Sequence, residues 1–227
     1  TSLPFGGGVA VDPVTGRYAT TNGSSTLYVY NGNDTLYDTE GIIGCGGHVA
    51  AGNGTFGIST QCTDRFHIYN ESTSSITVPA NYYHGTGSWV TYNGATDKYY
   101  WRTDPSTTYV YSESPPAEVG SISGYFVGEA NPVTNRLYAL NTSTWTLNVL
   151  DGTTHAVTAT IPGAAGDVAV DTALDRIYLI QGGAIQVYNG AGTMSLGTIS
   201  LPVGDTPDLR DMAVGDDRLY VVGHPAS

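Results

Sequence analysis

Few residues in this sequence have the types and spacing that chemistry requires. Its histidines are scattered, and no two of them form a His-x-x-x-His pair or a similar metal-binding spacing. A Gly-x-Ser-x-Gly elbow, a phosphate loop and a helix-loop-helix calcium loop are all missing. The remaining candidates for an active site are Asp12, His48, Glu129 and Asp171. The three carboxylates fit equally well as turn or strand-end residues. We therefore assign no catalytic residue, no cofactor and no metal ligand.

One acidic run precedes the last predicted strand pair. It consists of Asp205, Asp208, Asp211, Asp216 and Asp217. Several carboxylates in one loop could hold a calcium ion, because calcium takes about six to eight oxygen ligands. A solvated acidic turn is the simpler interpretation, and calcium is kept as the alternative.

The two cysteines, Cys45 and Cys62, lie on either side of an Asn53-Gly54 turn. Asn-Gly is a strong signal for a two-residue hairpin, here flanked by Gly52 and Thr55. Each cysteine is seven residues out from that turn (52 − 45 and 62 − 55), so the regular ladder places them directly opposite each other. They fall at a non-hydrogen-bonded pair, where Cα atoms are about 4.5 Å apart. We predict a disulfide, which indicates an oxidising compartment. Free or metal-binding thiols are the alternative.

Five Asn-x-Ser/Thr sequons lie in predicted turns and therefore at the surface. Their asparagines, the glycosylation candidates, are Asn22, Asn33, Asn53, Asn70 and Asn141. Asparagine is also a common turn residue, so turn formation alone is the alternative explanation. A separate loop contains Tyr82, Tyr83 and His84, which are the ligand-binding candidates because aromatic side chains in loops can stack on sugars.

A β-unit recurs along the chain. Val9 to Gly32 reads as three short strands separated by Gly-, Asn- and Asp-containing turns, and Ala169 to Gly190 repeats the pattern. Successive units start 37 to 45 residues apart, near Val9, Val49, Val90, Val127, Val168 and Ala213. Such a period with four strands per unit is typical of a β-propeller. We predict an all-β protein in which residues 1–227 form a single propeller domain of six blades.

The sixth unit is incomplete. It has predicted strands at 212–214 and 218–222, after which five residues remain. Ser2-Leu3-Pro4 resembles the end of other fourth strands, so the N-terminal strand can close the last blade. One strand of that blade still has no source. Either the blade has three strands, or its exposed edge takes a strand from another chain.

Five of the eight Lys and Arg residues share one repeat position, the start of the second strand. They are Arg17, Lys98, Arg136, Arg176 and Arg218. We expect each of them to lie beside an acidic or amide residue of the preceding turn. The chain as a whole has a net charge of −12, which disfavours binding to nucleic acid or to anionic membranes. It has no apolar run of the roughly 18 to 20 residues needed to span a bilayer.

Two segments resemble a known repeat. Asp12-Pro13-x-Thr15-x-Arg17-Tyr18-Ala19-Thr20-Thr21-Asn22 and Asn131-Pro132-x-Thr134-Asn135-Arg136-Leu137-Tyr138-Ala139-Leu140-Asn141 are similar to the surface-protein propeller repeats named for a Tyr-Val-Thr-Asn signature. The match is good in units one, four, five and six and weak in two and three. The resemblance implies a propeller that is secreted or surface-attached, and it implies no catalytic residues.

The sequence therefore favours an extracellular or cell-surface, non-enzymatic propeller. We expect it to act as a scaffold, an adhesin or a filament subunit, with copies of itself or other surface proteins as partners. A carbohydrate-binding propeller with glycans as partners is the first alternative. A lyase or hydrolase with a site in the axial funnel is the second.

Overall fold

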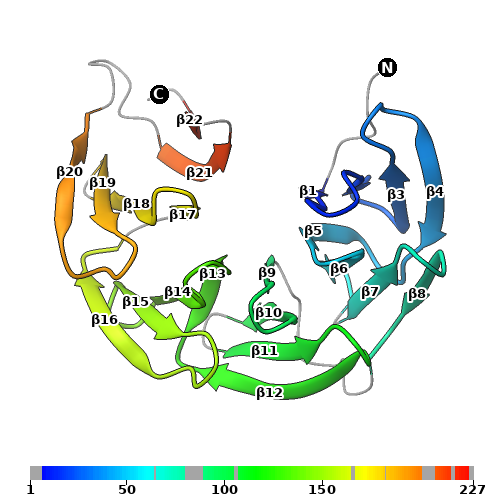
Figure 1. Cartoon of the computed structure of the whole chain (residues 1–227), viewed down its shortest axis with the longest axis horizontal. Coiled ribbons are helices and arrows are strands. Elements are labelled where there is room, and N and C mark those ends of the chain that lie inside the picture. The colour runs from blue at the N-terminus through cyan, green and yellow to red at the C-terminus, as the bar shows by residue number, and fades with distance from the viewer. Residues whose placement is uncertain are drawn as a thin grey trace. The chain divides into compact units, whose positions relative to one another are not determined.

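The structure is a computed structural model that describes residues 7–63, 65–79, 89–104, 107–164, 167–181, 183–200, 208–215 and 218–224. The chain forms two compact units, Thr1–Ser123 and Gly124–Ser227. All regular elements in the described residues are strands, and no helix occurs among them (Figure 1). The all-β prediction is confirmed, while the single-domain assignment stays a prediction.

The N-terminal unit contains three four-stranded antiparallel sheets, each a simple meander. The first consists of β1 (Val9–Val11), β2 (Tyr18–Thr21), β3 (Thr26–Tyr30) and β4 (Leu36–Gly41). The second consists of β5 (Gly46–Ala51), β6 (Thr55–Thr60), β7 (Phe66–Asn70) and β8 (Ser75–Thr77). The third consists of β9 (Trp89–Asn93), β10 (Lys98–Asp104), β11 (Thr107–Ser112) and β12 (Ala117–Ser123).

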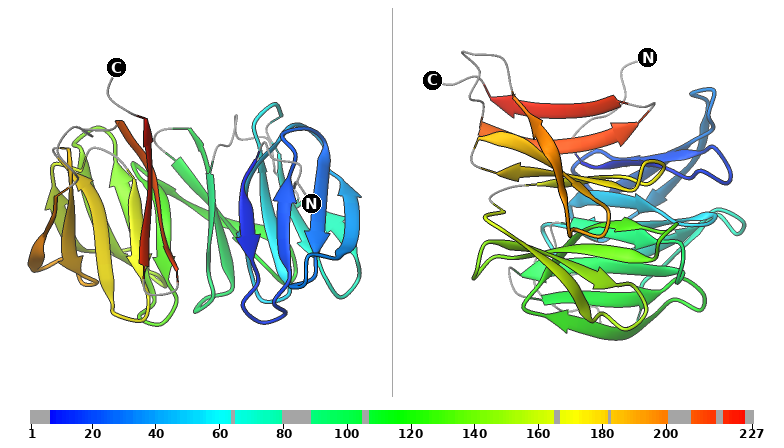
Figure 2. Two further views of the ribbon diagram at one scale, coloured as in Figure 1. Left: turned by 90° about the horizontal axis from the view of Figure 1, so that it is seen from above. Right: turned by 60° about the vertical axis from the view of Figure 1, so that its left-hand side comes forward.

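The C-terminal unit contains two more four-stranded meanders and one strand pair (Figure 2). Its first sheet has β13 (Phe126–Asn131), β14 (Arg136–Asn141), β15 (Thr146–Asp151) and β16 (Val157–Pro162). Its second has β17 (Val168–Asp171), β18 (Arg176–Gln181), β19 (Ala184–Asn189) and β20 (Ser195–Ile199). The pair is β21 (Asp208–Gly215) and β22 (Arg218–His224). Of the two strands predicted here at 212–214 and 218–222, β22 agrees within two residues and β21 begins four residues earlier.

The same side-chain-to-backbone hydrogen bond forms the first turn of four sheets. The last residue of the first strand, or the one after it, is a buried Asp or Asn whose Oδ1 accepts the backbone N–H two residues on, at 2.7 to 3.1 Å. These residues are Asp12, Asn93, Asn131 and Asp171. Each such bond mimics a backbone turn, which fixes where the strand ends.

The residue one or two positions before the second strand is left-handed in five sheets. The positions are Gly16, Gly54, Asp97, Asn135 and Asp175, with φ between 48° and 80°. Glycine, asparagine and aspartate tolerate this conformation best, which explains the residue types found there. Four residues separate the paired strand ends in four of these turns, and two residues separate them in the second sheet. In all five the left-handed residue comes directly before the residue that closes the turn, so equivalent positions can be compared from sheet to sheet.

The cores lie between successive sheets within each unit. In the N-terminal unit, Phe66 packs its ring against those of Trp101 and Tyr111, with centroids 5.7 and 4.8 Å apart. In the C-terminal unit, Tyr138, Val149 and other buried residues pack with the second sheet. Alternate side chains of each strand face these cores, as the pleat requires.

The Cys45–Cys62 disulfide is confirmed, with Cα atoms 5.1 Å apart. The predicted register around it is wrong by one residue. A bulge lies between Gly46 and Val49, so Gly46 pairs with Thr60, and Gln61 N donates to Cys45 O at 2.9 Å. The ladder therefore places Gln61, not Cys62, opposite Cys45. Both cysteines lie close enough beyond the end of the ladder for the bond to form.

The last strand pair buries one face and exposes the other. Met212 is buried with Ala169, Ile180 and Ile185, while Tyr220 and Val222 are 50% and 62% exposed. The segment Ser2-Leu3-Pro4, predicted to close this blade, lies outside the described residues.

Candidate functional site

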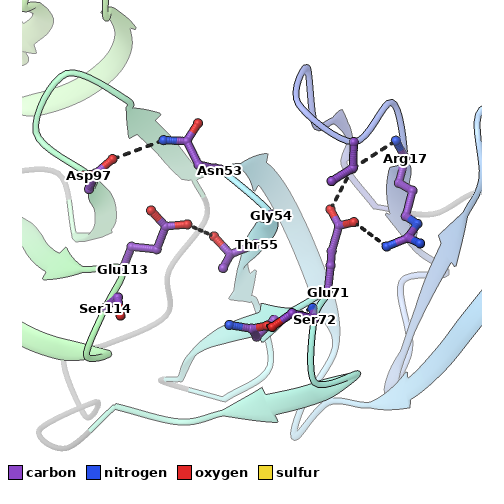
Figure 3. Close-up of a pocket in the computed structure, with 11 residues that line it drawn as sticks. Arg17, Asn53, Gly54, Thr55, Glu71, Ser72, Asp97, Glu113 and Ser114 are labelled. Carbon is purple, nitrogen blue, oxygen red and sulfur yellow. Dashed lines mark hydrogen bonds and ion pairs between the residues drawn. The ribbon is translucent and has the colours of Figure 1, made fainter.

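A polar pocket of about 480 Å³ lies in the N-terminal unit, where turns of its three sheets meet (Figure 3). The β1–β2 turn contributes Thr15 and Arg17, and the β5–β6 turn contributes Asn53 to Thr55. The ends of β7 and β11 contribute Glu71 and Glu113, and Asp97 comes from the β9–β10 turn. The lining thus has three carboxylates and one guanidinium.

One side of the pocket is an ion pair between the first two sheets. Arg17 Nη1 lies 2.9 Å from Glu71 Oε2, and Thr15 Oγ1 donates to Glu71 Oε1 at 3.2 Å. The guanidinium also lies over the Tyr37 ring, 3.6 Å from its centroid. Burial raises the pKa of Glu71 above its usual value, and the hydrogen bond from Arg17 opposes that shift. The carboxylate of this junction has its own cation.

The other side joins the second and third sheets, and its described side-chain donors are hydroxyl and amide groups, none of them charged. Thr55 Oγ1 donates to Glu113 Oε1 at 2.5 Å and lies 2.7 Å from Tyr99 OH. Tyr92 OH lies 2.7 Å from Glu113 Oε2 and 3.1 Å from Asp97 Oδ1. Burial, followed by the bond to Glu113, raises the pKa of Tyr92 far above its usual value. The phenol therefore keeps one proton, which it can give to only one of the two carboxylates at a time.

A third junction, in the C-terminal unit, resembles the first. Arg136 Nη1 lies 2.9 Å from Asp175 Oδ2, and Asn131 Nδ2 donates to Asp175 Oδ1 at 3.0 Å. In both ion pairs the carboxylate belongs to the following sheet. The backbones of Arg17 and Arg136 pair with Asp12 and Asn131 of the preceding turn, while the ion-pair partners of both cations come from the next repeat.

The residues proposed for an active site have structural partners instead. Asp12 is buried and accepts bonds from Val14 N at 2.7 Å and Gly54 N at 2.8 Å. Asp171 accepts from two backbone N–H groups of its own turn. The His48 ring packs against that of Trp89, with centroids 4.1 Å apart and planes tilted by 39°. Glu129 lies in β13 opposite Tyr138.

The sequons form turns. In Asn22, Asn33, Asn70 and Asn141, Oδ1 accepts the backbone N–H of the Ser or Thr two residues on. Asn53 is exposed and donates from Nδ2 to Asp97 Oδ1 at 3.2 Å, at the pocket wall. Turn formation accounts for the four asparagines, and glycosylation stays a prediction.

The predicted ligand-binding loop with Tyr82, Tyr83 and His84 lies outside the described residues. So do Asp205, Asp216 and Asp217 of the acidic run, and the side chains of Asp208 and Asp211. Within the described part of the chain, no group of His, Cys, Asp and Glu side chains could hold a metal ion. No described segment is a helix long and apolar enough to cross a membrane.

The pocket itself was not predicted. Its carboxylates are far apart in sequence, and only the stacking of sheets brings them together. One signal was available in the repeat: five units have a cation at the start of the second strand, and the second unit has Thr55 there.

Comparison with known proteins identifies the fold and nothing further. No protein-family model and no curated protein matches the chain. Among solved structures 1191 chains match, so the architecture is common and does not by itself suggest an activity. One is a chain of hydrazine synthase from Kuenenia stuttgartiensis, with a TM-score of 0.76 and 12% identity over 97% of this chain and 74% of that chain. At this identity the likeness shows the fold alone, an all-β, propeller-like one.

Proposed function

We propose that this protein is an extracellular, non-enzymatic propeller of six blades that serves as a cell-surface scaffold, adhesin or filament subunit. Six successive sheets in the described residues support the blade count. The disulfide supports an oxidising, extracellular location. Asp12 and Asp171 are engaged in turns, which supports a non-enzymatic role.

The observation that carries the proposal is the edge of β22. Four sheets have a β-bulge in their outermost strand, at β4, β12, β16 and β20, and the outermost strand of the fifth, β8, has only three residues. Bulges and short strands are devices that protect a sheet edge from pairing with another chain. β22 has seven residues and pairs without interruption along its own length, and no described strand covers its other edge. It is therefore the edge best suited to accept a strand.

The native mass of the protein tests this proposal. Light scattering and electron microscopy over a concentration series should show assemblies larger than one chain. The double variant Tyr220→Lys/Val222→Lys places charges on β22 and should dissociate them. Leu196→Lys/Ile199→Lys, on the bulged strand β20, is the matched control and should leave them intact. A wild-type protein that stays monomeric at every concentration contradicts the proposal, and a glycan array then tests the carbohydrate-binding alternative.

A further inference from the structure

The register of the sheets shows which residues are equivalent at the pocket. The first residue of the second strand, or the residue just before it, closes the first turn opposite the end of the first strand. By this pairing Thr55, opposite Gly52, corresponds to Arg17, opposite Asp12. The same position is Lys98, Arg136 and Arg176 in the other four-stranded sheets. Thr55 is thus the one member without a positive charge among the five described four-stranded sheets.

The cation at this position has a defined task in two junctions. Arg17 pairs with Glu71, the residue directly after the third strand of the following sheet. Arg136 pairs with Asp175, the residue directly before the second strand of the following sheet. The carboxylate that pairs with this cation can therefore stand at either of two positions of the following sheet, directly after the third strand or directly before the second.

The third sheet has an acid at both carboxylate positions. Glu113 follows β11 as Glu71 follows β7, and Asp97 precedes β10 as Asp175 precedes β18. In both junctions an asparagine of the preceding sheet donates to the aspartate, Asn53 to Asp97 and Asn131 to Asp175, although Asn53 lies one position later in its turn than Asn131 does. The preceding sheet faces them with Thr55, which bonds to Glu113, and Asn53, which bonds to Asp97; both side chains are shorter than arginine and uncharged. Two carboxylates are therefore placed for a cation that no described residue supplies.

The burial of Glu113 makes this arrangement costly without a ligand. Only 9% of this residue is exposed, and its described partners are the hydroxyls of Thr55 and Tyr92. No cation in the described residues lies within ion-pair distance of it. Buried carboxylates are normally paired with a positive charge, because hydroxyl donors replace only part of their hydration. Arg17 cannot serve, since its guanidinium is bound by Glu71 and Tyr37.

We propose that the pocket binds an organic cation, a guanidinium or primary ammonium group, which Glu113 and Asp97 hold in the space that the missing arginine leaves beside Thr55. The group comes either from a free small molecule or from an Arg or Lys side chain of a partner. A metal ion fits less well, because the described residues contain no group that could hold one. This inference does not depend on the edge of β22, so either proposal can fail alone.

Calorimetry with agmatine tests the charge requirement, with N-butylurea as an uncharged analogue. Agmatine should bind and N-butylurea should not. Glu113→Gln keeps the shape and should weaken binding at least about 30-fold, as loss of one partner in a buried charge pair does. Glu40→Gln, on β4 outside the pocket lining, removes the same charge from the same unit and should have no effect. Equal binding of the two probes, or an unchanged affinity in Glu113→Gln, overturns the proposal.

A second variant tests whether the cation occupies the space beside Thr55. Thr55→Arg restores the arginine of the other junctions and should abolish agmatine binding while raising the thermal midpoint of unfolding. Circular dichroism establishes that this variant is folded; if it is not, Glu113→Gln still decides. The peptide Gly-Arg-Gly distinguishes a free small molecule from the side chain of a partner, with Gly-citrulline-Gly as its uncharged analogue. Tighter binding of the arginine peptide than of agmatine indicates a partner side chain. A thermal shift with calcium chloride that disappears in Glu113→Gln indicates an inorganic ion and contradicts the proposal.

Discussion

Two neighbouring junctions of the N-terminal unit use the same carboxylate position in different ways. Between the first and second sheets, Glu71 is neutralised by Arg17 at 2.9 Å. Between the second and third, Glu113 is held by Thr55 and Tyr92 hydroxyls. In the first junction the carboxylate is paired with a guanidinium of the protein. In the second, Glu113 has no described cation, and a space remains beside Thr55. In a repeat protein, the departure from the common pattern is therefore the best indication of a binding site.

The largest expected effect comes from removing the ion pair between the first and second sheets. Arg17→Met leaves Glu71 buried without its cation and should lower the free energy of unfolding by about 3 kcal/mol, less than for a fully buried pair because Arg17 is 26% exposed. Urea denaturation measures the change. The double variant Arg17→Met/Glu71→Gln should recover more than half of it. A single-variant loss below about 1 kcal/mol would show that the ion pair is unimportant.

Acid should weaken the same region through His67 of β7. Burial, followed by the charge of Arg65, lowers the pKa of His67 to about 4, below its ordinary 6.5. The neutral ring accepts a bond from Ile43 N. The contribution of neutral His67 to the free energy of unfolding is thus fully present above pH 6.5. About 2 to 3 kcal/mol of it is lost as the pH falls toward 4. Unfolding curves from pH 7 to 4 measure this loss, and His67→Gln should flatten it. An unchanged pH profile in the variant contradicts the assignment.

The two glutamates should respond to neutralisation with opposite signs. Glu71→Gln sets an amide NH2 group, which only donates, against one of the two donors that Glu71 accepts from, Arg17 Nη1 or Thr15 Oγ1, and should destabilise the protein by about 1 kcal/mol. Glu113→Gln removes a buried charge that lacks a cation, while the amide can still bond to Thr55 and Tyr92, so stability should stay equal or rise by about 1 kcal/mol. Thermal and urea unfolding of both variants in the absence of added amines measure the difference. A loss in Glu113→Gln as large as that in Glu71→Gln would remove the contrast between the junctions.

The smallest effect is a pH dependence of Glu71 itself. Its pKa in the folded protein lies above the usual 4.5, so the folded state binds this proton more readily than the unfolded state does. The stabilisation by protonated Glu71 is present below the usual pKa of 4.5 and is lost as the pH rises through the raised pKa of the folded state. In a His67→Gln background, the thermal midpoint should therefore rise by roughly 1 to 2 °C on acidification to pH 4. Glu71→Gln should abolish this rise, and a rise that persists must come from another group.

Much of the fold could be predicted because its signals are local. Asp12, Asn131 and Asp171 mark the ends of strands through bonds to their own turns, so the strand bounds followed from the sequence. The disulfide followed from the Asn53-Gly54 turn. Its register did not, because the pattern of apolar residues does not encode the bulge between Gly46 and Val49, where His48 N donates to Ser59 Oγ.

The pocket could not be predicted in the same way. Thr55 and Glu113 are 58 residues apart and meet only because the second and third sheets pack together. The identity of the partner across a junction depends on this stacking, so the cations were assigned to their own turns. Aligning the repeats by turn register places Thr55 among arginines and one lysine, which marks it as the exception.

The disulfide and the pocket occupy opposite ends of one hairpin. Cys45 and Cys62 join β5 and β6 at the open end, while Thr55 lies at the turn. Closing a loop of this size removes about 3 kcal/mol of chain entropy from the unfolded state. The same bond limits how far the hairpin can splay, so the turn is held in place before anything enters the pocket. A ligand there meets a preorganised wall and loses little binding energy to ordering it, and a reductant should weaken its affinity from a distance.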